Sequence, residues 1–327
     1  MKAYQLTGPQ TLEEVTAPDP EPKDGQVLLK IEHVSICGSD THLNFHPTLP
    51  EEQYPFAPGL PCHEIAGTIV ESKNPNNPVG QRAIILPTFD QGVGMTNGGL
   101  AELIASEKDI PHPDYGDTSD WVMCQPAGTA IQASREWGTT DDKTFLVMGQ
   151  GAIGLSTTAV AYRMGAQKVI GVDLDDYRLA KAAELGASLT LNADRDNLVE
   201  AVMDATDGQG VDVVVEATGD SNGINVAMEL VRRQGTIVSF TLVAADDPTV
   251  LRHQEWMRKE IRILPTNAAG AIDPVAPIRD MVGLRDRGWW DPAELITHRV
   301  GWDDIPDAYE MYSDRSDGVI KVAIAIE

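Results

Sequence analysis

The sequence predicts an α/β protein with two parts: a Rossmann-type, doubly wound parallel sheet domain and a β-rich, barrel-like domain. Residues 1–127 contain short apolar runs separated by clusters of Pro, Gly and Asn, which is typical of strands in an irregular β-domain. From residue 128 onward, continuous Val/Ile runs alternate with helical segments, which indicates a parallel sheet covered on both faces. With 327 residues, the chain is long enough for two hydrophobic cores.

Three segments of the β-rich region read as strands: residues 26–31, 65–70 and 82–86. Proline is dense at residues 17–22 and again around residues 47–61, so the chain between the strands is expected to be irregular. Together these features indicate a compact, barrel-like domain.

The second region alternates strands and helices along the chain. The expected strands are residues 145–148, 168–173, 211–216 and 236–240, and the expected helices are residues 154–165, 176–185 and 225–233. Gly186 and Gly235 end two of these helices, since glycine readily adopts the backbone that follows a last helical turn. After residue 265, only a helix at 274–287 and a strand at 318–326 remain. That is too little for a separate core, so this tail is expected to return to the first domain.

Composition excludes several kinds of partner. The net charge is −25 and no Lys/Arg run is present, so no nucleic acid is expected to bind. No stretch approaches the ~18 consecutive apolar residues of a membrane span, and the N-terminus lacks the apolar core of a secretion signal. Only Cys37, Cys62 and Cys124 occur, which argues against a disulfide framework and favours the cytoplasm. The acidic excess fits either a salt-adapted surface or an ordinary acidic cytosolic protein.

A glycine-rich motif at residues 149–154 carries the signal for dinucleotide binding. It follows the apolar run 144–148 and opens a predicted helix, which is the required context. Gly149 permits a tight turn, Gly151 lets the backbone approach a pyrophosphate, and Gly154 lets the helix pack closely against the sheet.

The residues after these glycines indicate which dinucleotide binds. Ala152 and Ile153 open the helix whose N-terminus would receive the phosphates. Asp173 ends the next strand, where its carboxylate would accept hydrogen bonds from both ribose hydroxyls and repel a 2′-phosphate. This favours NAD over NADP. Arg178 could cover the adenine face or reduce that repulsion.

A second motif pairs Cys37 with His63. Thiolate and imidazole are the ligands that zinc prefers, and Glu64 adds a carboxylate next to the histidine. Ser39 and His42 follow the cysteine closely and suggest a proton path. Metal ligands upstream of a nucleotide-binding fold indicate redox chemistry on an alcohol or carbonyl.

Four motifs together resemble those of the zinc-dependent medium-chain alcohol/polyol dehydrogenases. They are residues 37–42, 62–67, 98–102 and 149–154, and they occur in the order found in that family. The resemblance covers essentially the whole chain. It implies a GroES-like catalytic domain formed by residues 1–127 and 266–327, with residues 128–265 as the dinucleotide-binding domain.

The resemblance also implies a metal site. Cys37 and His63 resemble the first two zinc ligands, and Glu64 resembles the carboxylate beside the metal, a direct ligand in some states. The third ligand of the family falls on Gln125, whose neutral amide oxygen is a weaker ligand than a thiolate or carboxylate. Cys124 precedes Gln125, but on an extended segment the side chains of neighbouring residues point in opposite directions, so Cys124 would point away from the metal if Gln125 points toward it. No cysteine lies between His63 and Cys124, so the four-cysteine structural zinc lobe of many relatives is absent, and the short stretch 90–97 is expected to replace it. One zinc per chain is therefore expected.

Further implied roles concern the proton, the cofactor and assembly. Ser39 and His42 resemble the relay that passes the alcohol proton to solvent by way of a cofactor ribose hydroxyl, and Thr129 resembles the residue that packs on the nicotinamide. Relatives pair their nucleotide domains edge to edge, here through residues 261–265, so a homodimer or homotetramer is expected.

The function expected from the resemblance is zinc-dependent hydride transfer between NAD and a small-molecule alcohol, which could be a secondary alcohol, a polyol or a sugar-like compound. One alternative is a zinc-free, NADPH-dependent enone or quinone reductase on the same fold, which the Cys37–His63 pair argues against. Another is a non-catalytic nucleotide-binding protein, which Ser39 and His42 argue against. The substrate pocket would come from loops around residues 42–60, 85–97 and 265–290, and their shape cannot be predicted from one sequence.

Overall fold

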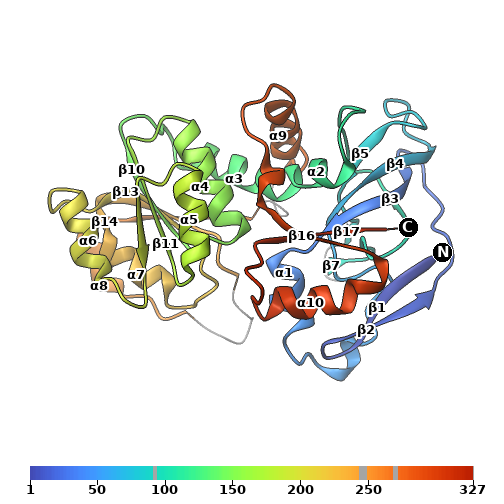
Figure 1. The fold of residues 1–327 in the computed structure, drawn as a ribbon, viewed down its shortest axis with the longest axis horizontal. Helices are drawn as coiled ribbons and strands as arrows, with labels where there is room; N and C mark the ends of the chain where they lie inside the picture. Colours follow the sequence, from blue (N-terminus) through green and yellow to red (C-terminus); the bar gives the residue numbers. More distant parts are fainter. Residues whose placement is uncertain (91–93, 243–248, 268–271, 327) are drawn as a thin grey trace. The chain divides into compact units, whose positions relative to one another are not determined.

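The computed structural model describes residues 1–90, 94–242, 249–267 and 272–326 (Figure 1). By their contacts, the residues form two compact units. The metal unit consists of Met1–Pro126 with Val275–Glu327, and the nucleotide unit consists of Ala127–Pro274. The expected fold class is confirmed, because one unit holds a parallel sheet between helices and the other a largely antiparallel β-structure.

The nucleotide unit is built on a six-stranded, wholly parallel sheet. Its strands are β10 (Thr144–Met148), β11 (Lys168–Asp173), β12 (Leu189–Asn192), β13 (Val211–Glu216), β14 (Val231–Ser239) and β15 (Arg262–Pro265). Their order in the sheet is β12-β11-β10-β13-β14-β15. The order reverses between β10 and β13, and ligands of doubly wound sheets bind at the carboxyl ends of the strands beside such a reversal.

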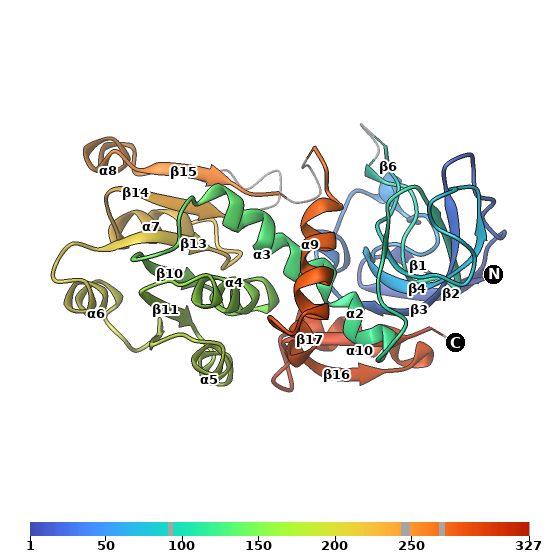
Figure 2. The same ribbon diagram turned by 90° about the horizontal axis from the view of Figure 1, so that it is seen from above.

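Helices cover both faces of this sheet (Figure 2). They are α4 (Ala152–Arg163), α5 (Asp176–Glu184), α6 (Leu198–Ala205), α7 (Gly223–Leu230) and α8 (His253–Lys259). Helices α4 and α5 contact each other, and α4 packs on β10 and β11 whereas α5 packs on β11 and β12. Helix α7 contacts both α6 and α8 and packs on β13 and β14. The central strands between the two layers have apolar middles, where Leu146, Val147, Val214 and Val215 are fully buried.

Two boundaries in this unit differ from the sequence-based expectation. The helix expected to reach Arg233 ends at Leu230, because Val231 takes extended backbone and pairs with Val211 on β13. The segment after β15 also remains with the nucleotide unit up to Pro274, whereas the sequence placed the boundary after residue 265. Thr266 explains part of this difference, since its N–H donates to the Ser239 carbonyl.

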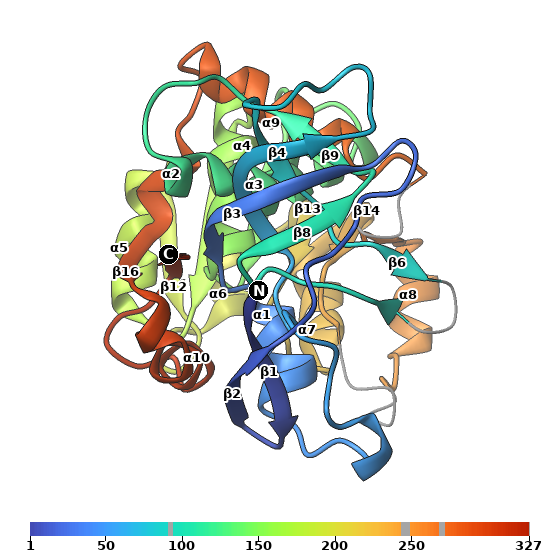
Figure 3. The ribbon, with the colours of Figure 1, turned by 90° about the vertical axis from the view of Figure 1, so that its right-hand side faces the viewer.

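The metal unit contains a seven-stranded sheet (Figure 3). Its strands are β3 (Val27–Ser35), β4 (Glu64–Ser72), β5 (Arg82–Ile85), β8 (Leu103–Ser106), β9 (Asp109–Pro111), β16 (Ile296–Val300) and β17 (Lys321–Ala325). The order is β16-β17-β3-β4-β5-β9, and β8 also pairs with β3. Because Ala323 of β17 pairs with Ser35 of β3, the C-terminal segment lies in the same sheet as the N-terminal one.

Shorter elements complete the metal unit. They are the hairpin β1 (Lys2–Gly8) and β2 (Thr11–Thr16), the pair β6 (Phe89–Asp90) and β7 (Gly94–Met95), and the helices α1 (Gly38–Asp40), α2 (Thr118–Val122), α9 (Ala276–Asp286) and α10 (Ile305–Ser313). Helix α3 (Cys124–Glu136) crosses the boundary between the units. Of the stretch 90–97 expected to replace the structural zinc lobe, residues 91–93 lie outside the described part of the chain. None of the helices in the described residues is long and apolar enough to cross a membrane.

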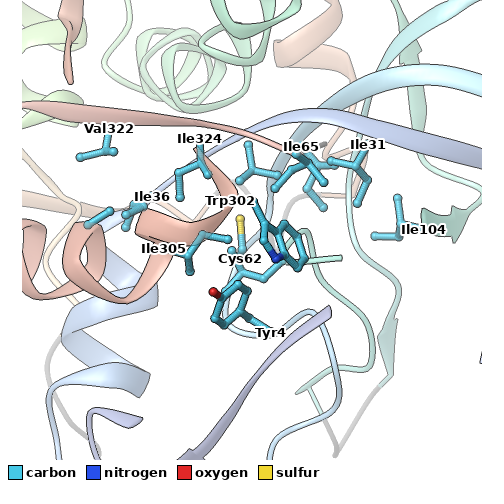
Figure 4. Close-up of a cluster of buried hydrophobic side chains, with 14 of the residues drawn as sticks. Tyr4, Ile31, Ile36, Cys62, Ile65, Ile104, Trp302, Ile305, Val322 and Ile324 are labelled. Atoms are coloured by element: carbon cyan, nitrogen blue, oxygen red, sulfur yellow. The ribbon is translucent and has the colours of Figure 1, made fainter. Parts of the chain in front are cut away.

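The core of the metal unit joins residues from both of its segments (Figure 4). Tyr4 near the N-terminus packs against Trp302 with ring centroids 5.0 Å apart. Cys62 is fully buried in this core as a small packing residue, and burial raises the pKa of its thiol. The core thereby fixes the end of β3 and the start of β4, where the predicted metal ligands begin.

Candidate metal centre and dinucleotide site

Three of the predicted metal ligands lie together at one end of the sheet in the metal unit. Cys37 follows β3, His63 immediately precedes β4, and Glu64 begins β4 opposite Ser35. Their sulfur, nitrogen and oxygen ligand atoms all lie within 4.8 Å of one another. Among the described residues, this is the one group of three or more Cys, His, Asp or Glu side chains close enough to share a metal ion. A thiolate, an imidazole and a carboxylate form a donor set that suits zinc.

Asp40 orients two of these ligands and was given no role in the sequence analysis. Its carboxylate is fully buried, with Oδ1 2.7 Å from His63 Nδ1 and Oδ2 accepting the Cys37 N–H at 3.0 Å. A histidine whose Nδ1–H is held by a carboxylate keeps its Nε2 lone pair for a metal. Burial disfavours the charged imidazole, but Asp40 and Cys37 outweigh it and raise the pKa of His63 well above its ordinary value. The signal that could have revealed Asp40 is an acid one helical turn after the cysteine.

Lys321 is the second residue that sequence reasoning missed. It is 1% exposed, and its Nζ lies 2.7 Å from Glu64 Oε1 and 2.5 Å from Glu64 Oε2. Ser35 donates a further hydrogen bond to Glu64 Oε2. Burial disfavours the ammonium, but Glu64 outweighs it, and the pKa of Lys321 is raised. A lone lysine in the apolar run 319–326 was the available signal.

The two residues of the expected proton relay occupy different environments. Ser39 Oγ donates to Cys37 Sγ at 3.3 Å, and its carbonyl accepts from Asn44 Nδ2 at 3.1 Å. His42 is exposed and lies in the π-helical turn Thr41–Phe45. The structure therefore places a hydroxyl beside the cysteine and an imidazole in contact with water.

The expectation that residues 124–125 are extended was wrong. Cys124 and Gln125 form the first turn of α3, so their side chains diverge by about 100° and do not point in opposite directions. Cys124 is fully buried, burial raises the pKa of its thiol, and it is not among the three clustered ligands. Gln125 is 8% exposed, and its role as a ligand remains a prediction. Asp117, which caps the preceding helix by accepting from the Ser119 N–H, could have signalled helix in this stretch.

The glycine-rich loop has the three properties that a dinucleotide requires. Gly149 has φ +82°, and a β-carbon there would lie 2.4 Å from the Ala217 carbonyl oxygen. At Gly154 a β-carbon would lie 1.7 Å from the Gly149 oxygen, so only glycine lets α4 approach the loop. At Gly151, in contrast, a β-carbon would meet nothing within 4 Å. Gly151 is also the N-cap of α4 and supplies no side-chain cap, which leaves the helix N-terminus open to an anion.

Asp173 is fixed at the carboxyl end of β11, beside this loop. Its Oδ2 accepts the Gln150 N–H at 2.5 Å, and its Oδ1 accepts the N–H groups of Leu174 and Asp175 at 2.8 and 3.0 Å. Three backbone donors therefore hold the carboxylate in one orientation. Gln150 was given no role in the sequence analysis, and it connects the glycine loop to the acid that follows.

The remaining predicted cofactor residues lie on helices of the nucleotide unit. Ala152 and Ile153 form the first turn of α4, and Thr129 lies in α3. Arg178 is buried on α5, where its Nε donates to Tyr177 at 2.8 Å and lies 3.6 Å from Asp175. The structure thus gives Arg178 partners on its own helix, and its contact with a cofactor remains a prediction.

Comparisons with known proteins give a family match for each of the two parts of the chain. Residues 23–113 match the family model described as an alcohol dehydrogenase GroES-like domain, and residues 152–279 match the one described as a zinc-binding dehydrogenase. The chain is 27% identical to the D-arabitol-phosphate dehydrogenase of Enterococcus avium, over 93% of this chain and 91% of that protein. It is 28% identical to an alcohol dehydrogenase of Cupriavidus necator, over 99% of this chain and 98% of that protein.

Solved structures share the fold along the whole chain. An E. coli CFT073 alcohol dehydrogenase complexed with NADH has a TM-score of 0.85 at 23% identity, over 100% of this chain and 99% of that one. A putative zinc-binding dehydrogenase from Sinorhizobium meliloti, bound to NADP, has a TM-score of 0.86 at 24% identity, over 99% of both chains. At this identity the likeness establishes the fold, and the two structures differ in the cofactor that they hold.

Proposed function

Because this chain belongs to the medium-chain dehydrogenase/reductase family, we propose that it transfers a hydride between NAD and a secondary alcohol, a polyol or a sugar-like alcohol. The observation that carries the proposal is the cluster of Cys37, His63 and Glu64, with ligand atoms within 4.8 Å of one another, in a chain that also has the glycine loop. The similarity to an alcohol dehydrogenase and to a sugar-alcohol-phosphate dehydrogenase supports an oxidoreductase acting on CH–OH groups.

The metal unit would hold one catalytic zinc. Cys37 and His63 are the first ligands, and Glu64 and Gln125 are the candidates for the third position. When bound, zinc supplies a Lewis acid that polarises the substrate oxygen. Asp40 keeps the His63 ring in one orientation through the 2.7 Å contact at Nδ1. A single zinc is proposed because the described residues hold one such cluster and the sequence lacks the cysteines of a structural site.

The nucleotide unit would hold NAD. The pyrophosphate is accommodated where Gly151 leaves space and where the N-terminus of α4 lacks a cap. Asp173, whose carboxylate is held by backbone N–H groups, is proposed to accept hydrogen bonds from both ribose hydroxyls, and its charge would disfavour a 2′-phosphate. Thr129 is proposed to pack on the nicotinamide. These features support NAD over NADP, although one structural relative was solved with NADP.

Ser39 and His42 are proposed to move the alcohol proton. Ser39 Oγ lies 3.3 Å from the Cys37 sulfur, so its hydroxyl can accept a proton released near the metal ligands. His42 is exposed and can release that proton to water. In the proposed relay, a cofactor ribose hydroxyl would pass the proton from Ser39 to His42, as the resemblance implies.

The proposal also covers assembly and location. Strand β15 ends the order of the described sheet, so its outer edge has no strand partner among the described residues. We propose that two copies pair there, as a homodimer or as half of a homotetramer in the cytoplasm. Light scattering at micromolar concentration would show at least twice the chain mass of 35.4 kDa. A monomer would contradict the pairing.

Metal analysis combined with a substrate screen tests the function. Dialysed protein should contain one equivalent of zinc, and a panel of secondary alcohols, polyols, sugars and hydroxy-amino acids should reveal NAD reduction at 340 nm (the absorbance maximum of reduced nicotinamide). Removing zinc should abolish oxidation, and adding zinc should restore it. Metal-independent reduction of an enone or quinone with NADPH would identify a zinc-free reductase. NADH binding without turnover of any substrate would identify a non-catalytic nucleotide-binding protein.

A further inference from the structure

Lys321 and Glu64 form a fully enclosed ion pair beside the clustered ligands. The side chains are 1% and 0% exposed. Besides the two Glu64 oxygens, Lys321 Nζ donates to the Ile36 carbonyl at 2.6 Å, so all three of its N–H groups are used. Ser35 gives the Glu64 carboxylate a further donor. Each oxygen of Glu64 therefore already accepts a hydrogen bond.

The same carboxylate belongs to the group that can hold a metal. Glu64 lies within 4.8 Å of the ligand atoms of Cys37 and His63 on one side and contacts Lys321 on the other. A metal ion and the ammonium therefore compete for the same carboxylate. Direct ligation by Glu64 would weaken its short contacts with Lys321 and leave a buried ammonium poorly compensated, which is costly.

A charge count shows what Lys321 does to the centre. Zinc contributes +2, whereas the Cys37 thiolate, the Glu64 carboxylate and the Asp40 carboxylate that contacts His63 contribute −1 each. The other two ligand candidates, His63 and Gln125, are neutral. With Lys321 the total is about zero, and without it the total is about −1. Lys321 thus keeps the centre from becoming negative, although two acidic residues lie next to the metal ligands.

We propose that Lys321 is a positioning residue that restrains Glu64 beside the metal and prevents it from becoming a permanent third ligand. This inference rests on the proposed function for the presence of zinc. The C-terminal strand β17 then has a role in the metal centre, because it places Lys321 near the end of β3 and the start of β4. Ser35 has the same task to a smaller degree, because it donates to the same carboxylate.

A purely structural role for Lys321 makes the opposite prediction. Lys321 also connects β17 to the Ile36 carbonyl, so its loss could simply loosen the wall of the site. A loosened site releases metal faster. A freed Glu64 that becomes a ligand releases metal more slowly.

The experiment measures zinc release from the purified, zinc-loaded protein into excess chelator, without cofactor or substrate. Lys321→Met should slow release about tenfold, Ser35→Ala should slow it about twofold, and Glu64→Gln should accelerate it. Lys321→Arg should behave as the wild type, because it keeps the charge. In the Glu64→Gln background, Lys321→Met should change the rate less than twofold. Lys259→Met is the matched control, since Lys259 Nζ also donates to three backbone carbonyls but lies in the nucleotide unit.

Clear outcomes would overturn the inference. If folded Lys321→Met releases zinc at the wild-type rate or faster, Glu64 is not restrained by Lys321. If Lys321→Met does not fold, Ser35→Ala decides, and unchanged or faster release from it overturns the proposal. A wild-type protein that retains no zinc contradicts the proposed function as well, so the two failures can be told apart.

Discussion

The glycine loop and the metal centre differ in the groups that they present to a ligand. The loop offers backbone N–H groups, open space at Gly151 and one carboxylate, Asp173, that is held by three backbone donors. The metal centre offers side chains that are buried or partly buried, and it depends on charges that compensate one another, as in the buried pair Lys321–Glu64. A backbone site tolerates changes in most side chains, whereas a site of buried charges depends on each partner.

This comparison predicts the largest effect for loss of a metal ligand. Cys37→Ala should lower kcat/KM for alcohol oxidation by roughly 10³-fold or more, because Lewis-acid stabilisation supplies several kcal/mol. The dissociation constant for NADH, measured by fluorescence titration, should stay within twofold of the wild type. Cys124→Ala is the matched control and should retain zinc, because Cys124 is outside the ligand cluster. An active Cys37→Ala enzyme would refute the metal assignment.

Acid should destabilise the metal unit before the nucleotide unit. Burial lowers the pKa of His112 from 6.5 to about 4, and that of His33 is also lowered. Between these pH values the unfolded chain binds a proton that folded His112 does not, so the stability that His112 contributes is intact above pH 6.5 and falls by about 3 kcal/mol towards pH 4.

Urea unfolding at pH 7 and pH 5 measures this loss, and His112→Phe should remove most of it while keeping the contact with Trp121. His253→Phe makes the same substitution in the nucleotide unit and serves as the control. An equal pH dependence in wild type and His112→Phe would show that other groups control the acid response.

A larger side chain at Gly151 should weaken cofactor binding at the glycine loop without affecting zinc binding or folding. Gly151→Val has space for its side chain and should fold normally and keep zinc, yet it should weaken NADH binding on the order of 100-fold by blocking the approach of the phosphates. Gly154→Ala should instead impair folding, because its β-carbon would lie 1.7 Å from the Gly149 oxygen. Fluorescence titration and thermal melts separate the two defects. Normal NADH affinity in Gly151→Val would place the phosphates elsewhere.

Loss of the carboxylate behind His63 should have an intermediate effect. Asp40→Asn removes the charge that orients the imidazole and should weaken zinc binding by roughly 10–100-fold. Competition with a chelator of known affinity measures this change. Asp173→Asn makes the same substitution in the nucleotide unit and should leave zinc affinity unchanged.

The smallest effect is expected in cofactor choice. Asp173→Ala should reduce the preference for NAD over NADP by roughly tenfold, since it weakens ribose binding and removes the repulsion of a 2′-phosphate. The ratio of kcat/KM values for the two cofactors reports this shift. A wild-type enzyme that prefers NADP would refute the role assigned to Asp173.

The two units also differed in how well the sequence predicted them. The strands 168–173 and 211–216 were predicted residue by residue, because buried parallel strands read as continuous apolar runs. The glycine loop was equally clear, since its requirements are local to residues 149–154. The misplaced end of α7 shows the limit of local reasoning, because Val231 is extended through pairing with a distant strand.

The metal centre could be predicted only in part. Cys37 and His63 were found by residue type, whereas the contact of Lys321 with Glu64 joins positions 257 residues apart. A contact between residues so far apart leaves no local pattern in the sequence from which it could be predicted. Gln125 was placed on an extended segment because no apolar periodicity marks the short first turn of α3.

The pairing of β17 with β3 has a consequence for synthesis of the chain on the ribosome. The nucleotide unit is one continuous stretch, so all of its residues have been made once Pro274 is added. The metal unit must wait for Lys321–Ala325, because these residues supply both a strand of its sheet and the counter-charge of Glu64. Since domains fold as units during translation, the growing chain can form its cofactor-binding half before its metal centre exists.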